Sequence, residues 1–355
     1  MERKKITLID VANKAGVSKA TASRALQNHP RQSKATCKRV QEAAKELGYI
    51  KHPLVSALMT EIRRKRPSTL NTTLALVHGY HMEFEPPPSL IHLRKGAIEA
   101  AEANGYKLEE FFLWEPGMTP QRLISILASR GIYGVIFEQI ILKQVQEVRL
   151  PIDLSNFAAV AIEFSLQEPN LNRVDIDQYN GLLLAFEKTR EKGYKRIGLV
   201  TNRNEEHLCQ KKRLAAMYLA QQSIPVKNRI PPLVTTDYLS ELNTSLPKWI
   251  EEQKVEAILS PRRILPQELK ALGYNIPEDI GFAQLMVAEN QIDGYSGVMP
   301  KWTMVGAIAV NQIIGRLNRN DFGVPAYPTA TYAPGIWVDG NTLKDKRKTS
   351  VKDSA

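Results

Sequence analysis

Long hydrophobic runs are missing from this 355-residue chain. No apolar stretch in it approaches the roughly 18 to 20 residues that a transmembrane helix needs. The first residues, MERKKITLIDV, also lack the apolar core of a signal peptide. Cysteine is scarce, because only Cys37 and Cys209 occur, and their separation fits no metal-ligand spacing. We therefore expect a cytoplasmic protein with free thiols and no contact with a membrane.

The sequence patterns of common enzyme sites are absent as well. There is no GxGxxG after a strand, no GxxxxGKS or GxxxxGKT, no HExxH and no GxSxG. The six histidines are scattered, and although His78 and His81 lie three residues apart, no third metal ligand accompanies them. These absences predict a protein that is not an enzyme and that needs no metal or cofactor.

What the sequence does have is an uneven distribution of charge. Residues 1–66 contain 16 Lys and Arg against 5 Asp and Glu, a surplus of 11 that equals the net charge of the whole chain. Residues 67–355 are therefore neutral overall. A basic segment attached to a neutral body indicates a polyanionic partner for that segment, although a solvated basic tail is the alternative.

Residues 1–48 combine this charge with the apolar spacing of three short helices. Thr7 followed by Asp10 is similar to a capping box, and Gly16 is suited to end the first helix. Ser18 and Ser33 are suited to cap a second and a third helix. Because only the three residues AGV separate the first two helices, we predict a helix-turn-helix. A small three-helix unit that binds nothing is the alternative.

The second of these helices is the one that would enter a major groove. Arg24 is suited to a bidentate contact with guanine, and Ala20 to a contact with a thymine methyl group. Hydroxyl and amide side chains near the helix starts are suited to hold phosphates. The predicted DNA contacts of this segment are Thr7, Ser18, Lys19, Ala20, Thr21, Ser23, Arg24, Asn28 and Ser33.

The run from ITLIDV to ELGYI resembles the headpiece of the LacI/GalR family of repressors along its entire length. The matching pieces are IDVA, AGVS, SRALQN, Ser33 with Thr36, and ELGYI. Cys37 is a departure that puts one phosphate contact in doubt, because the family usually has Arg after that threonine. The resemblance implies a homodimer that reads a near-palindromic operator in double-stranded DNA.

Residues 49–66 are predicted to form a hinge helix and linker. Pro53 suits a first helical position, and good helix formers follow it up to a basic cluster. In the family, a leucine of this helix wedges into the minor groove at the operator centre, and Leu58 holds that position here. The family's earlier hinge proline is Lys51 in this sequence, so the helix start is expected to shift. An ordinary linker helix is the alternative.

From Thr72 onward, apolar runs alternate with amphipathic helical stretches. One series extends from TLALVHGY to FAAVAIEF, and a second extends from YNGLLLAFEKTREKGY to IGFAQL. This alternation predicts parallel sheets with crossover helices in two similar lobes. We therefore expect an all-α headpiece (1–48), a hinge (49–66), an α/β two-lobed body (67–343) and a disordered polar tail (344–355).

The body resembles the same family more weakly, through VDIDQYNG, GYKRIGLV, KRLAAM, GYNIPEDIG and MVGAIAVNQIIGRL. The resemblance implies a periplasmic-binding-protein-like (type I) fold, a dimer formed mainly by the body, and an effector cleft between the lobes. In the family, an arginine typically grips ligand hydroxyls, and Arg213 matches it. Asp177 matches the start of the second lobe.

Two departures from the family concern the effector itself. The family's Asn-Asp is Arg262-Arg263 here, and its Gly-Phe-Asp signature is Gln284-Leu285-Met286. Arginines in place of aspartates suit an anionic ligand better than a neutral sugar, unless they are solvated or paired with Asp or Glu. Side chains that follow first-lobe strands are further candidates for the cleft, with packing or solvent exposure as the alternative role. These are Tyr80, His81, Phe137, Glu138, Glu163 and Phe164.

The leading hypothesis is a dimeric, sequence-specific transcription regulator, and more specifically a repressor. Its effector would be a sugar or sugar derivative, including an anionic one, that changes the angle between the lobes and so the spacing of the hinges. Two alternatives stay open. One is a DNA-binding regulator whose body is a ligand-independent dimerisation platform, and the other is a solute-binding module with a vestigial headpiece.

Overall fold

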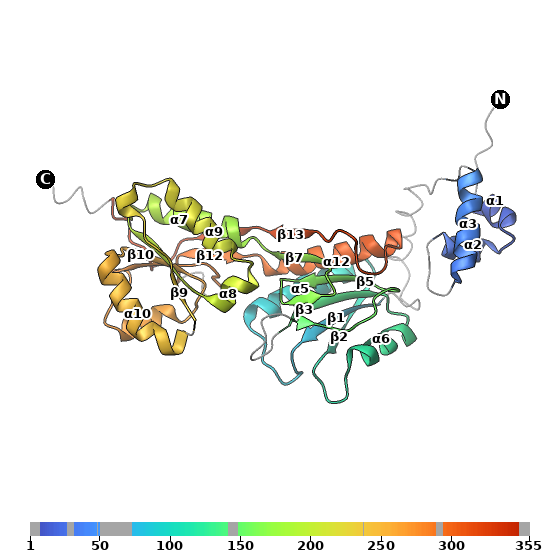
Figure 1. Cartoon of the computed structure of the whole chain (residues 1–355), viewed down its shortest axis with the longest axis horizontal. Coiled ribbons are helices and arrows are strands. Elements are labelled where there is room, and N and C mark those ends of the chain that lie inside the picture. Colours follow the sequence, from blue (N-terminus) through green and yellow to red (C-terminus); the bar gives the residue numbers. More distant parts are fainter. Residues whose placement is uncertain are drawn as a thin grey trace, which may run out of the picture.

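The computed structural model describes residues 8–26, 32–47, 49, 73–140, 148–236, 238–288 and 294–347. These residues form a small helical headpiece and a body of two α/β lobes, which lie side by side along the long axis of Figure 1. The hinge prediction over 49–66 lies outside the described residues, apart from Tyr49.

The headpiece consists of α1 (Leu8–Lys14), α2 (Lys19–Ala25) and α3 (Lys34–Leu47). Gly16 follows α1 with a φ of +64°, a left-handed conformation that costs glycine little. The Ser18 hydroxyl accepts a hydrogen bond from the Thr21 N–H at 3.1 Å, and the Ser33 hydroxyl accepts one from the Thr36 N–H at 3.1 Å. Both predicted caps therefore form, and the helix-turn-helix is confirmed.

The first lobe is built on a six-stranded sheet whose order is β13-β7-β5-β3-β1-β2, and every pairing in it is parallel. Its strands are β1 (Thr73–Gly79), β2 (Lys107–Phe112), β3 (Gly134–Ile140), β5 (Ala158–Ile162), β7 (Asn172–Ile176) and β13 (Ala330–Ala333). Its helices are α5 (Pro88–Ala103), α6 (Pro120–Ser129) and α12 (Trp302–Arg319). A separate pair of short strands, β4 (Val148–Arg149) and β6 (Leu166–Glu168), lies beside it.

The second lobe repeats this plan with the order β14-β12-β11-β10-β8-β9, in which only the β12–β14 pairing is antiparallel. Its strands are β8 (Ile197–Asn202), β9 (Leu233–Thr235), β10 (Ala257–Ser260), β11 (Gly281–Gln284), β12 (Gly297–Pro300) and β14 (Gly335–Val338). Its helices are α7 (Gln178–Glu191), α8 (Arg203–Leu208), α9 (Lys212–Gln222), α10 (Tyr238–Gln253) and α11 (Leu265–Ala271), with a 3-10 turn at Val226–Asn228.

The chain passes between the lobes at three places among the described residues. It leaves the first lobe between β7 and α7, returns between β12 and α12, and leaves again between β13 and β14. Residues 302–333 therefore belong to the first lobe although they follow the second lobe in sequence. The predicted last long helix, MVGAIAVNQIIGRL, is part of α12 and does return to the first lobe, where it packs against α5.

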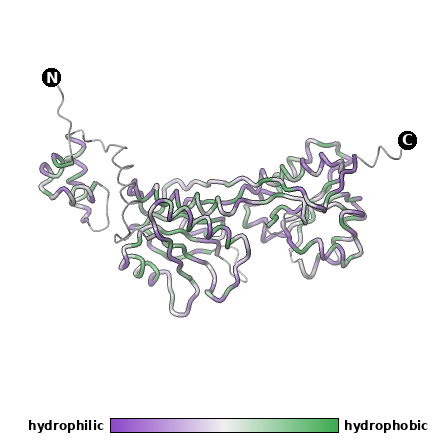
Figure 2. Tube along the Cα trace, turned by 180° about the vertical axis from the view of Figure 1, so that it is seen from behind, coloured by the Kyte–Doolittle hydropathy of each residue, from purple (hydrophilic) through white to green (hydrophobic). Residues whose placement is uncertain are grey.

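Helices α5 and α12 approach each other closely because glycines face the neighbouring backbone. A Cβ added to Gly306 would lie 2.1 Å from the Leu93 carbonyl oxygen, and one added to Gly96 would lie 1.9 Å from that of Thr303. The apolar side of this helix pair covers one face of the first sheet, and Leu93, Val305 and Ile313 are fully buried there. Figure 2 shows hydrophobic residues along the strands and hydrophilic residues on the outer helices.

The predicted polar tail differs from the structure at its start. The Lys346 N–H donates to the Lys192 carbonyl at 2.9 Å, and the Lys346 ammonium lies 4.5 Å from the centre of the Tyr194 ring. Residues 344–347 thus lie against the second lobe, because a lysine stem can pack on an aromatic ring while its charge stays solvated. None of the helices described is both long and apolar enough to cross a membrane.

Candidate DNA interface and effector cleft

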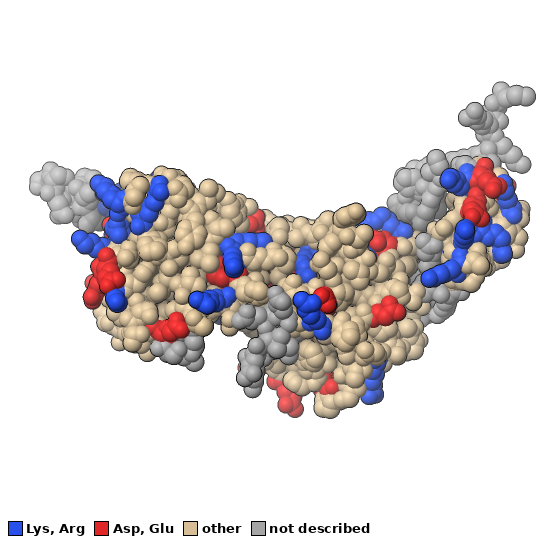
Figure 3. Space-filling model, viewed as in Figure 1, with Lys and Arg blue, Asp and Glu red and all other residues tan. Residues whose placement is uncertain are grey.

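Helix α2 presents its charged side chains to solvent and its alanines to the core. Lys19 and Arg24 are exposed, whereas Ala22 and Ala25 are fully buried against α1 and α3. Thr21 and Ser23 are half-buried. The exposed side of α2 is therefore free to approach a nucleic acid, and Figure 3 shows lysines and arginines on the surface of the headpiece.

Two of the predicted phosphate-binding hydroxyls already have intramolecular partners. The Ser18 hydroxyl donates to the Thr21 hydroxyl at 2.9 Å besides capping α2, and the Ser33 and Thr36 hydroxyls lie 2.8 Å apart. Both serines stay exposed, so their second lone pairs and neighbouring N–H groups remain accessible. The Cys37 side chain packs inside the headpiece core, which removes it from any phosphate contact.

Several predicted DNA contacts are not tested by the geometry. Thr7, Asn28 and Leu58 lie outside the described residues, as does the side chain of Ala20.

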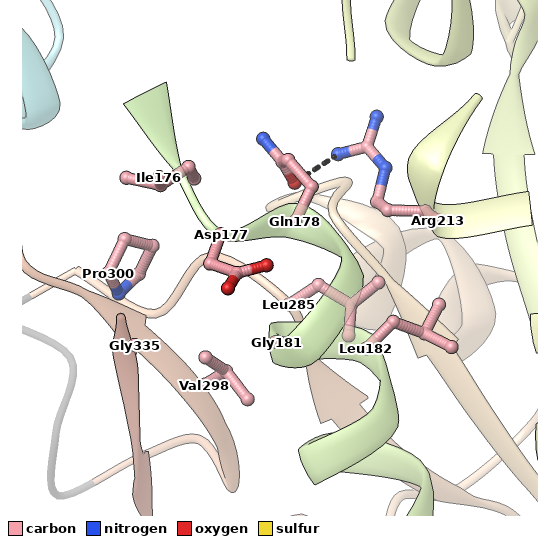
Figure 4. Close-up of a pocket in the computed structure, with 10 residues that line it drawn as sticks. All are labelled: Ile176, Asp177, Gln178, Gly181, Leu182, Arg213, Leu285, Val298, Pro300 and Gly335. Carbon is pink, nitrogen blue, oxygen red and sulfur yellow. Dashed lines mark hydrogen bonds between the residues drawn. The ribbon is translucent and has the colours of Figure 1, made fainter. Parts of the chain in front are cut away.

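In the body, Arg213 and Asp177 come together at one pocket. Figure 4 shows both residues, with Gln178 between them, around a narrow pocket with a free volume of only about 10 Å³. The Arg213 side chain is 3% exposed; its Nε donates to Glu206 Oε1 at 2.9 Å, and its Nη1 donates to Gln178 Oε1 at 3.4 Å. Asp177 accepts from the Asn180 N–H at 2.9 Å and so caps α7. Arg213 is thus held and neutralised within its own lobe.

The other two predicted effector arginines do not join this pocket. Arg262 is half-buried, donates from Nε to Glu268 Oε2 at 2.8 Å, and makes a second bond between Nη2 and Oε1. Arg263 is exposed and lines a different pocket, of about 480 Å³, together with His92 and Trp302. The structure therefore does not assemble the three arginines into one anion site.

On the first lobe, Glu163 follows β5 with a φ of +57°, which is rare for a residue with a side chain. Burial, together with the charges of Asp175 and Glu138, raises the pKa of Glu163 to about 8. Asp175 is 2% exposed, and burial raises its pKa to about 6. No hydrogen bond reaches the Glu163 carboxylate from the part of the chain that the structure describes. Glu163 therefore offers an acceptor at the lobe boundary, where the charge of Arg213 also acts on it.

Behind Glu163, a buried polar network ties three neighbouring strands together. His78 Nδ1 lies 2.6 Å from Glu138 Oε2, and His78 Nε2 lies 3.2 Å from Glu110 Oε2. Burial lowers the pKa of His78, but the hydrogen bonds to Glu110 and Glu138 outweigh it, and the net shift is upward. Tyr80, a predicted cleft residue, is 3% exposed and accepts from Arg94 Nη2 at 2.9 Å.

Two further candidates for the cleft on the first lobe lie in different places, one in the core and one on the surface. Phe137 is fully buried in the apolar core with Leu123 and Leu127, because a central parallel strand is covered on both faces. Its predicted cleft role is therefore corrected to packing. His81 is exposed.

Phe164 takes part in a contact between the lobes that sequence reasoning missed. The Lys212 ammonium, on α9 of the second lobe, lies 4.0 Å from the centre of the Phe164 ring and 4.7 Å from that of Tyr332 on β13. Its charge also acts on Asp175. Asp175 could have been noticed as an acidic residue inside the strand VDID, but nothing local marks Lys212. Within the described residues, no group of His, Cys, Asp and Glu is arranged to hold a metal ion.

Comparisons with known proteins match both parts of this architecture. Residues 7–52 match the model of the bacterial regulatory proteins of the lacI family. The headpiece belongs to the LacI family. The chain is 30% identical to the HTH-type transcriptional repressor CytR of Escherichia coli (strain K12) over 210 residues, which cover 57% of this chain and 55% of CytR. The chain thus spans about half the length of this relative.

A longer match comes from the HTH-type transcriptional regulator MalR of Streptococcus pneumoniae, which is 25% identical over 88% of this chain and 90% of MalR. Among solved structures, the regulator CelR in complex with cellobiose aligns with a TM-score of 0.54 at 18% identity, over 95% of this chain and 99% of CelR. The Lac repressor dimer bound to operator aligns with a TM-score of 0.53 at 17% identity, over 96% of this chain and all of that chain (100%). The body therefore has the LacI-type, periplasmic-binding-protein-like fold.

Proposed function

We propose that this LacI-family protein is a sequence-specific, DNA-binding transcription regulator that acts as a homodimeric repressor and is not an enzyme. The observation that carries the proposal is the exposed α2 face, with Lys19 and Arg24, in the basic segment 1–66 that holds the whole charge surplus of the chain. A recognition helix presented in this way fits a major groove. This function requires access to chromosomal DNA, and therefore a cytoplasmic location.

The proposal is tested by selecting bound fragments from a genomic DNA pool and then measuring the affinity of Arg24→Ala for the selected site. We expect a loss of about 1–3 kcal/mol on the selected site and a relaxed base preference at one position. Lys45→Ala is the matched control, because Lys45 is an exposed cation in the last turn of α3 and not on α2. An equal loss on random DNA for Arg24→Ala would exclude base reading.

We also propose that a small polyhydroxylated molecule between the lobes modulates this activity. Glu163 and Asp175 supply carboxyl groups on the first lobe, where the two aspartates of the family's second-lobe signatures are missing. Because Arg213 and Arg262 are already paired with Glu206 and Glu268, the proposed ligand of this cleft is a neutral sugar rather than an anion. CelR and a CcpA of Weissella paramesenteroides have been solved with cellobiose and glucose bound, respectively.

The same pairing favours a second candidate, in which the body is a ligand-independent dimerisation platform. Thermal-shift titration of the full chain with glucose, cellobiose and glucose 6-phosphate separates the two candidates. Stabilisation by a sugar in the wild type, but not in Glu163→Gln, supports the effector cleft. A flat response to all three compounds, with a dimer in sedimentation analysis, supports the platform.

A further inference from the structure

Arg173 on β7 is a buried cation outside the effector cleft described above. It is 5% exposed, its Nη1 donates to the Glu163 carbonyl at 3.1 Å, and its guanidinium carbon lies 5.1 Å from the centre of the Phe164 ring. Burial lowers the pKa of Arg173. The protein thus holds this guanidinium away from bulk water with a carbonyl and a ring as its partners.

Arg173 lacks the acidic partner that the other buried arginines have. Arg213 is paired with Glu206, and Arg316 with Asp321 at 3.1 Å. No Asp or Glu among the described residues lies within ion-pair distance of Arg173. A buried charge is costly unless an opposite charge and hydrogen bonds compensate it. One carbonyl leaves most of the five guanidinium donors unused.

The unused side of Arg173 lines a pocket between the lobes, with a volume of about 570 Å³ including its open mouth. First-lobe residues Phe164, Gln167, Asn170 and Thr329 form most of the lining, and Gln210 from the second lobe completes it. The polar members carry amide and hydroxyl groups and bring no negative charge. Gln167 Nε2 already donates to the Phe164 carbonyl and Thr329 Oγ1 to Asn172 Oδ1, so the amides of Asn170 and Gln210 are the donors offered to a ligand. None of the residues that line the pocket is acidic.

We propose that this pocket binds a small oxyanion, a phosphate or carboxylate group, against the Arg173 guanidinium. The planar fork of arginine matches the two oxygens of such a group, and a charge-assisted, bidentate pair offsets the burial of both ions. Because Gln210 belongs to the second lobe, a bound anion contacts both lobes. It is therefore a second ligand site that acts on lobe spacing; it adjoins Glu163 but shares no lining residue with the pocket at Arg213.

The proposal is tested with the full chain in a chloride buffer free of oxyanions. Thermal-shift and calorimetric titrations use inorganic phosphate, acetate and glucose 6-phosphate as three arms. Wild type, Arg173→Met and Arg173→Lys are compared, so any anion binding to the basic headpiece is common to all three. We expect at least one oxyanion to stabilise the wild type, with affinity for it at least about tenfold weaker in Arg173→Met and intermediate in Arg173→Lys.

Arg173→Met should also melt at a higher temperature than the wild type when no oxyanion is present, because it removes an uncompensated buried charge. Asn170→Asp provides a second variant on an exposed position of the same pocket. It supplies an internal carboxylate and should abolish the oxyanion response. Arg149→Met is the matched control, since Arg149 is 64% exposed and paired with Glu168.

A response to phosphate and glucose 6-phosphate identifies a phosphate site, and a response to acetate alone identifies a carboxylate site. Equal responses in wild type, Arg173→Met and Asn170→Asp would overturn the proposal, as would no response of the wild type to any arm. None of these measurements uses DNA, so their failure is distinct from failure of the proposed regulator function.

Discussion

The second lobe pairs two of its predicted effector arginines with its own carboxylates, Arg213 with Glu206 and Arg262 with Glu268. The first lobe instead leaves Glu163 without a hydrogen-bonding partner among the described residues and keeps Glu138 Oε1 buried without one. The two arginines of the second lobe are therefore already compensated, although Lys212 Nζ and Gln284 Oε1 on this lobe are also buried without a hydrogen-bonding partner among the described residues. In the proposed effector cleft, Glu163 on the first lobe is then the group expected to select the ligand, although the family's characteristic arginine matches Arg213 on the second lobe.

The largest effect is expected when one partner of the buried Arg213–Glu206 pair on the second lobe is removed. Arg213→Met should lower the free energy of unfolding by about 3 kcal/mol, because it leaves the Glu206 carboxylate buried without its cation. Urea denaturation measures the change. The double variant Glu206→Gln/Arg213→Met should recover a large part of the loss, and Arg262→Met, at a more exposed pair, should cost less. Equal losses in the free energy of unfolding for Arg213→Met and Arg262→Met would contradict the expected difference between the buried and the more exposed ion pair.

A smaller effect is expected for Glu163→Gln on the first lobe. Because the folded pKa of Glu163 is raised to about 8, the native state keeps a proton that the unfolded state has released above pH 4.5. Stability therefore falls as pH rises between 4.5 and about 8. Glu163→Gln should remove this loss, gaining about 1 kcal/mol at pH 8 after allowance for solvent screening and nothing below pH 4.5. A gain that is the same at both pH values would reflect packing rather than charge.

The smallest effect concerns the network behind Glu163. The folded pKa of His78 is raised, so its charged form stabilises the native state fully below pH 6.5, and this contribution is lost as pH rises through the raised pKa. His78→Gln keeps one hydrogen-bond donor, so the difference should be about 0.5–1 kcal/mol at pH 6. The difference should shrink at alkaline pH. Denaturation curves of the wild type and His78→Gln from pH 6 to 9 measure this difference in the free energy of unfolding. A difference that does not change with pH would mean that the charged imidazolium plays no part.

The sequence was informative where structure depends on neighbours along the chain. Gly16, Ser18 and Ser33 end or begin headpiece helices because their backbone and hydroxyl chemistry acts over three or four residues. The alternation of strands and helices predicted the two parallel lobes for the same reason, since apolar periodicity is local.

Contacts between residues far apart in the sequence could not be predicted in this way. The sequence leaves a cleft role and a packing role open for Phe137, and only the fold decides for packing, because both faces of its strand are covered and the ring lies in the core. For Arg262 the sequence leaves a ligand contact and a pairing with Asp or Glu both open, and the structure has the pairing, with Glu268 on α11. No sequence motif marks Arg173. Its importance depends on the fold, because no Asp or Glu among the described residues lies close enough to pair with it.

The return of residues 302–333 to the first lobe has a consequence for biosynthesis. The sheet face lined by Val305, Val310 and Ile313, and the edge beside β7, are completed only by these late residues. A ribosome must therefore synthesise almost the entire second lobe before the first lobe can complete its sheet and cover its core. Until then, an apolar sheet face and an unpaired strand edge stay open, which exposes the nascent chain to aggregation. Truncation before residue 302 should leave neither a soluble fragment nor a folded first lobe, however intact its own 73–176 segment is.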